Sequence, residues 1–304
     1  MVISALRLLG VVPIAAICAY RMITLALNTR SWAVLLPPEG RPRFPTLMRM
    51  RWIGESVNTL LPVAQVGGDF ARAALVTSRG VPRADAAASM MADLATGVLT
   101  HMIFGLGGAA ALFHILPKGR GHGVWTEVVA GLLVATLVVV GVSMSFHLGA
   151  AHIGRRLLGH SRAQEKLGKL AGSILKLDQA ISALLARETA VVQAVAWHLL
   201  GWISQVGETW MLLHFFDAPV TFRIALAIES LSTAARGAAF FVPSGIGVQE
   251  VTIFSICRLL GIDMEDALAL TIAKRAREIL MGVPGLLAWL MDQGWWKRWR
   301  GGHE

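Results

Sequence analysis

Long apolar stretches alternate with short basic or polar clusters along most of the chain. Several of these stretches approach or exceed the roughly 18 apolar residues that a membrane-spanning helix needs. The pattern predicts spanning helices over residues 4–27, 87–113, 124–148, 189–215 and 267–291. The stretch at 124–148 is the clearest of them, because polar residues are rarest there.

Two further apolar stretches contain residues that a continuous helix does not tolerate. The first is LLPVAQVGGD, at 60–69, and the second is FFVPSGIGVQE, at 240–250. Proline has no amide N–H to donate and glycine weakens a helix, so the backbone is expected to break in both places. The predicted helix breaks are Pro62, Gly67, Gly68, Pro243, Gly245 and Gly247. Each break predicts a hairpin of two short helices. In the first hairpin one helix runs to about residue 61 and the other starts at about 69; in the second the helices cover 222–241 and 247–260.

The two interrupted stretches recur at a constant spacing. Pro62 and Pro243 are 181 positions apart, and the same offset superposes Asp69 on Glu250. Each half is interpreted as a span, a re-entrant hairpin and a span, and the extra central helix at 124–148 makes the halves antiparallel. The predicted fold is an all-α polytopic membrane protein with an inverted repeat, an arrangement common among secondary transporters. A chance alignment of two Pro/Gly kinks is the alternative.

Residues 1–304 are predicted to form a single integral membrane domain. Its parts are a first repeat (1–113), a central helix with a cytoplasmic amphipathic linker (114–188), a second repeat (189–291) and a cytoplasmic tail (292–304). Within the linker, leucine and isoleucine recur at three- and four-residue spacing from Leu167 to Leu184, which predicts one apolar helical face. That face is expected to lie on the membrane or the protein body. A partner-binding coiled coil is the alternative.

Composition points to the same class of protein. The chain is 55% hydrophobic and 15% charged, with a mean hydropathy of +0.60, whereas soluble domains have about 25% charged residues. The net charge of +9 comes from basic loops, which is typical of cytoplasmic loops and does not indicate nucleic-acid binding. We therefore expect a multi-pass protein of the bacterial inner (plasma) membrane with a cytoplasmic C-terminus. Cys18 and Cys257 lie far apart and predict no disulfide.

Both halves carry charged residues within apolar stretches, where a charge costs several kcal/mol unless it faces a partner or a cavity. We expect a shared polar cleft that receives a lipid headgroup, because arginine suits phosphate or carboxylate groups and amides suit polar headgroups. The candidate lipid-binding residues are Glu55, Asn58, Gln65, Asp69, Arg72, Glu229, Arg236, Gln249, Glu250, Arg275 and Arg277. Internal ion pairs that hold the two halves together are the alternative for these charges.

Other chemistry has little support in the sequence. No nucleophile elbow, phosphate loop or zinc motif occurs, so we expect neither an enzyme nor a cofactor. His101, His114 and His122 lack metal-ligand spacing on one helical face, so no metal site is expected. Asp93 and Glu208 are candidates for carrying a coupled proton or for a hydrogen bond between helices.

The strings NTLLPVAQVGGDFARA, FFVPSGIGVQE and AKRARE resemble the flippase-like membrane domain of lysylphosphatidylglycerol synthases and their stand-alone relatives. The longer string IESLSTAARGAAFFVPSGIGVQE is similar to the branch encoded among hopanoid-biosynthesis genes (HpnL type). The resemblance covers about residues 28–291 and includes no soluble aminoacyl-transferase domain, so no lysyl transfer is expected.

This resemblance implies a protein that moves a polar-headed lipid across the inner membrane. The lipid would be a hopanoid or an isoprenoid-linked intermediate, and lipid-biosynthesis enzymes would be partners. Two alternatives stay open: a non-catalytic scaffold for lipid-modifying membrane enzymes, and an intramembrane enzyme.

Overall fold

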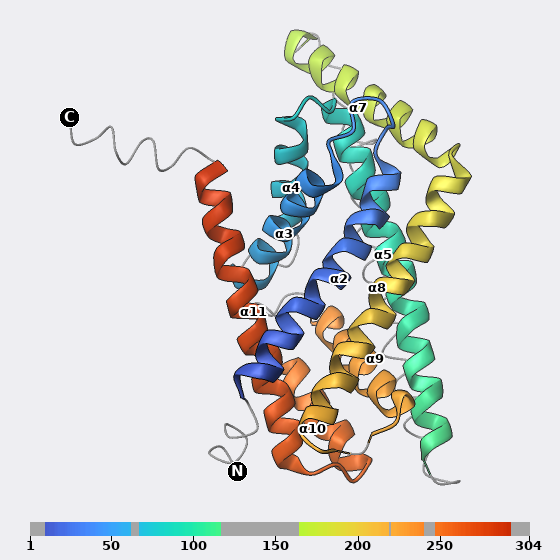
Figure 1. Ribbon diagram of the computed structural model, residues 1–304. Coiled ribbons are helices and arrows are strands. Elements are labelled where there is room, and N and C mark those ends of the chain that lie inside the picture. The colour runs from blue at the N-terminus through green and yellow to red at the C-terminus, as the bar shows by residue number, and fades with distance from the viewer. Residues whose placement is uncertain (1–9, 62–66, 117–163, 219, 240–246, 293–304) are drawn as a thin grey trace, which may run out of the picture.

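The computed structural model describes residues 10–61, 67–116, 164–218, 220–239 and 247–292. Within these ranges the chain forms nine α-helices and no strand, which confirms the all-helical class (Figure 1). The helices are α2 (Val11–Leu35), α3 (Phe44–Leu60), α4 (Gly67–Thr77), α5 (Arg83–Ile115), α7 (Gln164–Leu185), α8 (Glu188–Phe215), α9 (Phe222–Ala238), α10 (Val248–Leu259) and α11 (Met264–Asp292).

Two of these helices, α2 and α5, are long and apolar enough to cross a membrane. A third span results if residues 175–185 of α7 and the whole of α8 are counted as one, although they bend by 78° at the break between them. Apolar side chains such as Leu99 on α5 and Ile203 on α8 are about half exposed, at 48% and 51%. Exposed apolar side chains of this kind suit a lipid environment, and the prediction of a membrane protein is thereby supported.

The first helix ends at Leu35 rather than near residue 27 as predicted. Its polar residues do not mark the end of the helix, because Thr24, Thr29 and Ser31 are buried against the protein. Arg21 donates a hydrogen bond to Glu55, and the Thr29 hydroxyl donates to the carbonyl of Leu25 one turn earlier.

Both predicted interruptions occur between helices. α3 ends at Leu60 and α4 begins at Gly67, while α9 ends at Ala238 and α10 begins at Val248. Pro62, Gln65, Pro243 and Gly245 lie outside the described residues. α3 and α4 cross at two glycines, because a Cβ added to Gly68 would collide with the carbonyl of Gly54.

The helix boundaries repeat at the spacing seen in the sequence. α4 and α10 begin 181 positions apart, and so do α5 and α11. Gly80 and Gly261, also 181 positions apart, follow α4 and α10 with positive φ angles of 96° and 72°. A left-handed backbone is accessible to glycine without steric cost, so the same turn follows both helices.

The two hairpins lie toward opposite ends of the bundle in Figure 1, with α2 running diagonally between them. Residues 124–148, the extra helix that would relate the halves by inversion, are outside the described part of the chain, as is most of the tail at 292–304. The order of elements repeats, and the inversion of the repeat stays a prediction.

Each end of the bundle has its own apolar core. At the α3–α4 end, Trp32 of α2 packs in a cluster with residues of α3, α4 and the start of α5. At the α9–α10 end, Ile17 of α2 belongs to a second cluster, with residues of α8 to α11 and the end of α5. Helices α2 and α5 contribute to both cores and carry polar residues between them, as Arg21 lies between Ile17 and Trp32. The arrangement places a polar layer in the middle of the bundle.

The predicted linker helix is confirmed as α7, which crosses one end of the bundle in Figure 1. Leu184, from the predicted apolar face, is 6% exposed and packs in a small cluster with Leu35 and Ala194. The side chains of Leu167, near the start of that face, and its neighbours are outside the described set.

Candidate functional site

A polar cavity of about 340 Å³ lies in the middle of the bundle, among α2, α3, α5 and α8 to α11. Six residues that the sequence predicted as lipid-binding contribute to its wall: Glu55, Asn58, Glu229, Arg236, Gln249 and Arg277. They come from both hairpins and from the last helix. The structure therefore brings residues of the two halves to one site.

The cavity lining contains pairs of residues that are 181 positions apart in the sequence. Glu55 of α3 is matched in this way by Arg236 of α9, and Trp52 by Thr233. The positions repeat while the side chains differ, so that a carboxylate in one half corresponds to a guanidinium in the other. A cavity between structural repeats is where secondary transporters hold their substrates.

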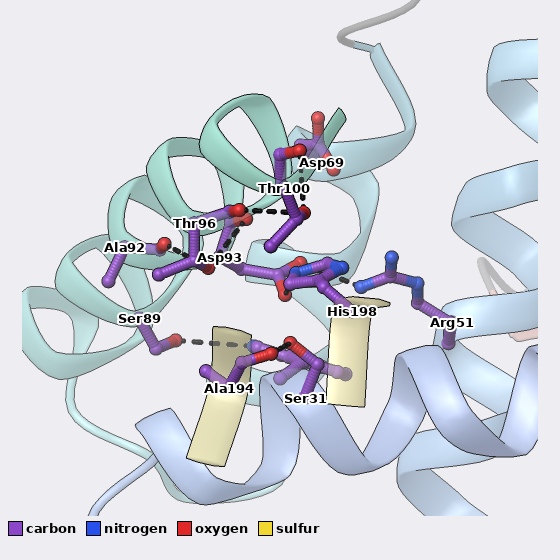
Figure 2. Close-up of polar contacts among 12 residues, drawn as sticks. Ser31, Arg51, Asp69, Ser89, Ala92, Asp93, Thr96, Thr100, Ala194 and His198 are labelled. Carbon is purple, nitrogen blue, oxygen red and sulfur yellow. Dashed lines mark hydrogen bonds and ion pairs between the residues drawn. The ribbon is translucent and has the colours of Figure 1, made fainter. Parts of the chain in front are cut away.

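Asp93 of α5 is the centre of a first ion-pair network behind the cavity wall. Its carboxylate accepts hydrogen bonds from Arg51 at 2.7 Å and from Arg72 at 3.0 Å, and lies 3.1 Å from Nε2 of His198. Figure 2 shows Asp93 beside His198 of α8 and Arg51 of α3. Asp93 is only 3% exposed, and a buried carboxylate is tolerated when it is paired and hydrogen-bonded in this way.

This first network reaches the cavity through Glu55. Arg51 lies 3.3 Å from the Glu55 carboxylate, which also accepts a hydrogen bond from Arg21 at 3.0 Å. The predicted site residues Asp69 and Arg72 pair with each other at 2.5 Å and are not part of the cavity wall. They support the wall from behind, through Asp93.

Glu278 of α11 is the centre of a second network. Its carboxylate accepts hydrogen bonds from Arg236 at 2.7 Å and from Arg275 at 2.6 Å. Arg275 also donates to Glu250 at 2.6 Å, and Arg236 donates to the side-chain oxygen of Gln249 at 3.1 Å. Glu250 and Arg275, both predicted site residues, lie outside the cavity wall and hold Glu278 in place.

Two further buried pairs lie in the same half as the second network. Glu229 of α9 accepts hydrogen bonds from Lys274 and from Thr209, and Lys274 and Glu229 are 6% and 2% exposed. Arg277 pairs with Glu208 of α8 at 3.1 Å. Asp93 and Glu208, the two candidate proton carriers, are thus both engaged in ion pairs.

The two networks are balanced in charge. The first joins three guanidiniums to three carboxylates, contributed by Arg21, Arg51, Arg72, Glu55, Asp69 and Asp93. The second, counted together with the two neighbouring pairs, contains four cations and four carboxylates, contributed by Arg236, Lys274, Arg275, Arg277, Glu208, Glu229, Glu250 and Glu278. Pairing of this kind offsets the cost of burying each charge.

The charged candidates therefore do form ion pairs inside the protein. The arginine pairs of the first network lie within the first half of the chain, and the arginine and lysine pairs around the second lie within the second half, so these pairs do not hold the two halves together. Polar contacts between the halves include Asp93 with His198, Thr24 with Ser204, and the indole N–H of Trp52, which donates to the carbonyl of Met281.

Several residues of the wall are absent from the sequence-based set. They include Arg21, His101, Trp202, Gln205, Lys274 and Glu278. Arg21, Lys274 and Glu278 meet the criterion that was used for the predicted site residues, a charge within an apolar stretch. That signal was sufficient to find them. His101 and Gln205 carry no comparable signal, because single histidine or glutamine residues often occur in helices. Among the described residues, no group of three His, Cys, Asp or Glu side chains is placed to hold a metal ion.

Comparison with known proteins relates the chain to a membrane family. It is 23% identical over 252 residues to a UPF0104 membrane protein of Pyrococcus horikoshii. The aligned region covers 79% of this chain and 74% of that protein. No solved structure matches the chain. The family model described as the lysylphosphatidylglycerol synthase TM region matches residues 2–285. The protein therefore belongs to the family of the lysylphosphatidylglycerol synthase transmembrane region.

Proposed function

We propose that this protein moves a polar-headed lipid between the two leaflets of the membrane. The observation that carries the proposal is the polar cavity in mid-bundle, which both hairpins line at positions related by one offset. Apolar cores at both ends and exposed apolar side chains outside give the cavity hydrophobic surroundings. A lipid headgroup needs such a polar shelter in order to cross a hydrocarbon layer.

The size of the cavity supports a headgroup as its occupant. A volume of about 340 Å³ is near the lower end of small-molecule sites and far below what a whole lipid requires. The tail would stay in the bilayer while the headgroup occupies the cavity. The proposal assigns the protein no catalytic step.

Hopanoids or isoprenoid-linked intermediates of a bacterial inner membrane are the lipids that this proposal favours. The support is the resemblance of residues 228–250, IESLSTAARGAAFFVPSGIGVQE, to the hopanoid-associated branch. The family description and the archaeal relative are consistent with a lipid-related membrane role and name neither lipid.

A leaflet-specific assay tests the proposal. Purified protein in liposomes should change the transbilayer distribution of a labelled polar-headed lipid. Replacing Thr233 in the cavity wall with Phe should abolish this activity by filling the space. Ser255→Phe is the matched control, because Ser255 also bonds to a backbone carbonyl in its own helix but is exposed and outside the wall. An unchanged lipid distribution with the unsubstituted protein would overturn the proposal.

A scaffold for lipid-modifying enzymes is the second candidate, because α7 exposes apolar side chains such as Leu175, at 62%. Leu175→Ser and Leu185→Ser should then abolish co-purification with lipid-modifying enzymes without affecting lipid movement. Retained complexes in the double variant would count against the scaffold.

A further inference from the structure

The geometry points to an uncharged headgroup that carries several hydroxyl groups, such as a sugar or a polyol, as the occupant of the cavity. This inference rests on the proposed function in taking the occupant to be a lipid headgroup. It concerns the chemistry of that headgroup, which neither the family description nor the name of the relative states.

The charges in the cavity wall already have partners. Arg21 is paired with Glu55, and Lys274 with Glu229. Arg236 and Arg277 pair with Glu278 and Glu208, respectively. An anionic headgroup would have to displace one of these carboxylates and leave it buried without a partner, and removing one member of a buried pair is strongly destabilising. A cationic headgroup would have to displace an arginine or lysine from its carboxylate and leave that cation buried without a partner. An uncharged headgroup leaves every pair intact.

His101 supplies an acceptor that needs a hydrogen bond. Its ring is hydrogen-bonded to the backbone of Thr233, whose amide N–H is committed inside α9. The ring therefore donates to the carbonyl of Thr233. The other nitrogen, Nε2, is buried without a hydrogen-bond partner among the described residues. In the neutral ring Nε2 can only accept, so it requires an O–H or N–H donor.

The position of His101 is fixed by its neighbours. The ring stacks on Trp202, with ring centroids 4.5 Å apart, and the Trp202 indole N–H donates to the Thr100 hydroxyl at 3.2 Å. His101 also lies close to Gly237, where an added Cβ would be 3.0 Å from the ring. The unpaired acceptor is therefore held in place before any ligand arrives, which lowers the entropic cost of binding.

Two amides supply donors in the same wall. The side-chain oxygen of Asn58 accepts from the amide of Gly68 at 2.7 Å, and that of Gln249 accepts from Arg236. Because both oxygens are engaged, it is the NH₂ groups that are left for a ligand, and these can only donate. A hydroxyl group can donate to His101 and accept from an amide, whereas a fully ionised phosphate can only accept and an ammonium group can only donate.

Competitive lipid binding to the purified protein, measured by native mass spectrometry, tests the inference. Two diacylglycerol lipids with identical chains would be used, one carrying glucose and one carrying phosphate. We expect the glucosyl lipid to bind at least tenfold more tightly. His101→Phe, which keeps an aromatic ring, should remove about tenfold of that affinity, and His214→Phe, at an exposed histidine outside the wall, should not.

A gain of phosphate binding provides a second readout that loss of folding cannot mimic. Glu229→Gln leaves Lys274 without its carboxylate, so this variant should bind the phosphate lipid more tightly than the unsubstituted protein does. Equal binding of both lipids, or a preference of the unsubstituted protein for the phosphate lipid, would overturn the inference and leave lipid movement standing. Selective binding of the glucosyl lipid without any movement would instead overturn the proposed function and support the inference.

Discussion

Glu55 of α3 and Arg236 of α9 line one cavity from positions 181 residues apart, and each is paired within its own half. Glu55 is held by Arg21 and Arg51, and Arg236 by Glu278. These two pairs would therefore stay intact if the halves moved relative to one another. That is a requirement for rocking of two repeats around a central site.

Asp93→Asn should strongly destabilise the protein. It removes the carboxylate shared by Arg51 and Arg72 and leaves two buried guanidiniums poorly compensated. The expected loss is about 3–5 kcal/mol in the free energy of unfolding, measured by denaturation in detergent. Asp178→Asn on the exposed surface of α7 should change it by less than about 0.5 kcal/mol. Equal stability of the two variants would mean that the Asp93 network has no structural role.

Gly68→Ala should disrupt the packing of the first hairpin. Its new methyl group would collide with the Gly54 carbonyl, and overpacking of this kind costs about 1–3 kcal/mol. Gly107→Ala on α5 is the control, because nothing lies within 4 Å of the added carbon. That variant should gain about 0.5–1 kcal/mol from higher helix propensity. Thermal unfolding of both variants would show whether the close crossing of α3 and α4 exists.

The Glu229–Lys274 pair is expected to act as a unit. Either Glu229→Leu or Lys274→Met alone leaves one buried charge unpaired and should cost about 3–5 kcal/mol, whereas the double variant should recover most of this loss. A double-mutant cycle on unfolding free energies measures the coupling. Additive effects of the two substitutions would show that the residues are not in contact.

The hairpins could be predicted from the sequence because their causes are local. Proline and paired glycines within about ten residues of each other favour a break, although Pro284 alone lies inside α11 and Gly107 with Gly108 inside α5. The helices restart at Gly67 and Val248, near the predicted positions.

The end of the first helix at Leu35 was missed because its polar residues suggested a loop. Two of those residues, Arg21 and Ser31, are accommodated by partners from elsewhere in the chain, Glu55 and the carbonyl of Ala194, which no local pattern shows.

The site was predictable only in part. Charges within apolar stretches identified Glu55 and Arg236, but the partner of each is set by packing between distant helices. Arg21 pairs with a residue 34 positions away, and Arg277 with one 69 positions away. The role of His101 in the wall could not be predicted, because it depends on Trp202 and Gly237 of two other helices.

The most direct test of the account is which lipids reach the cavity wall. Trp202, in the wall, and Trp210, exposed on the same helix, would each be replaced by the photo-crosslinking residue benzoylphenylalanine. After illumination in native membranes, mass spectrometry would identify the lipids bound at each position. The account predicts one selected class of polar-headed lipid at position 202 and the bulk membrane lipids at position 210. No lipid at position 202, or the same mixture at both positions, would contradict it.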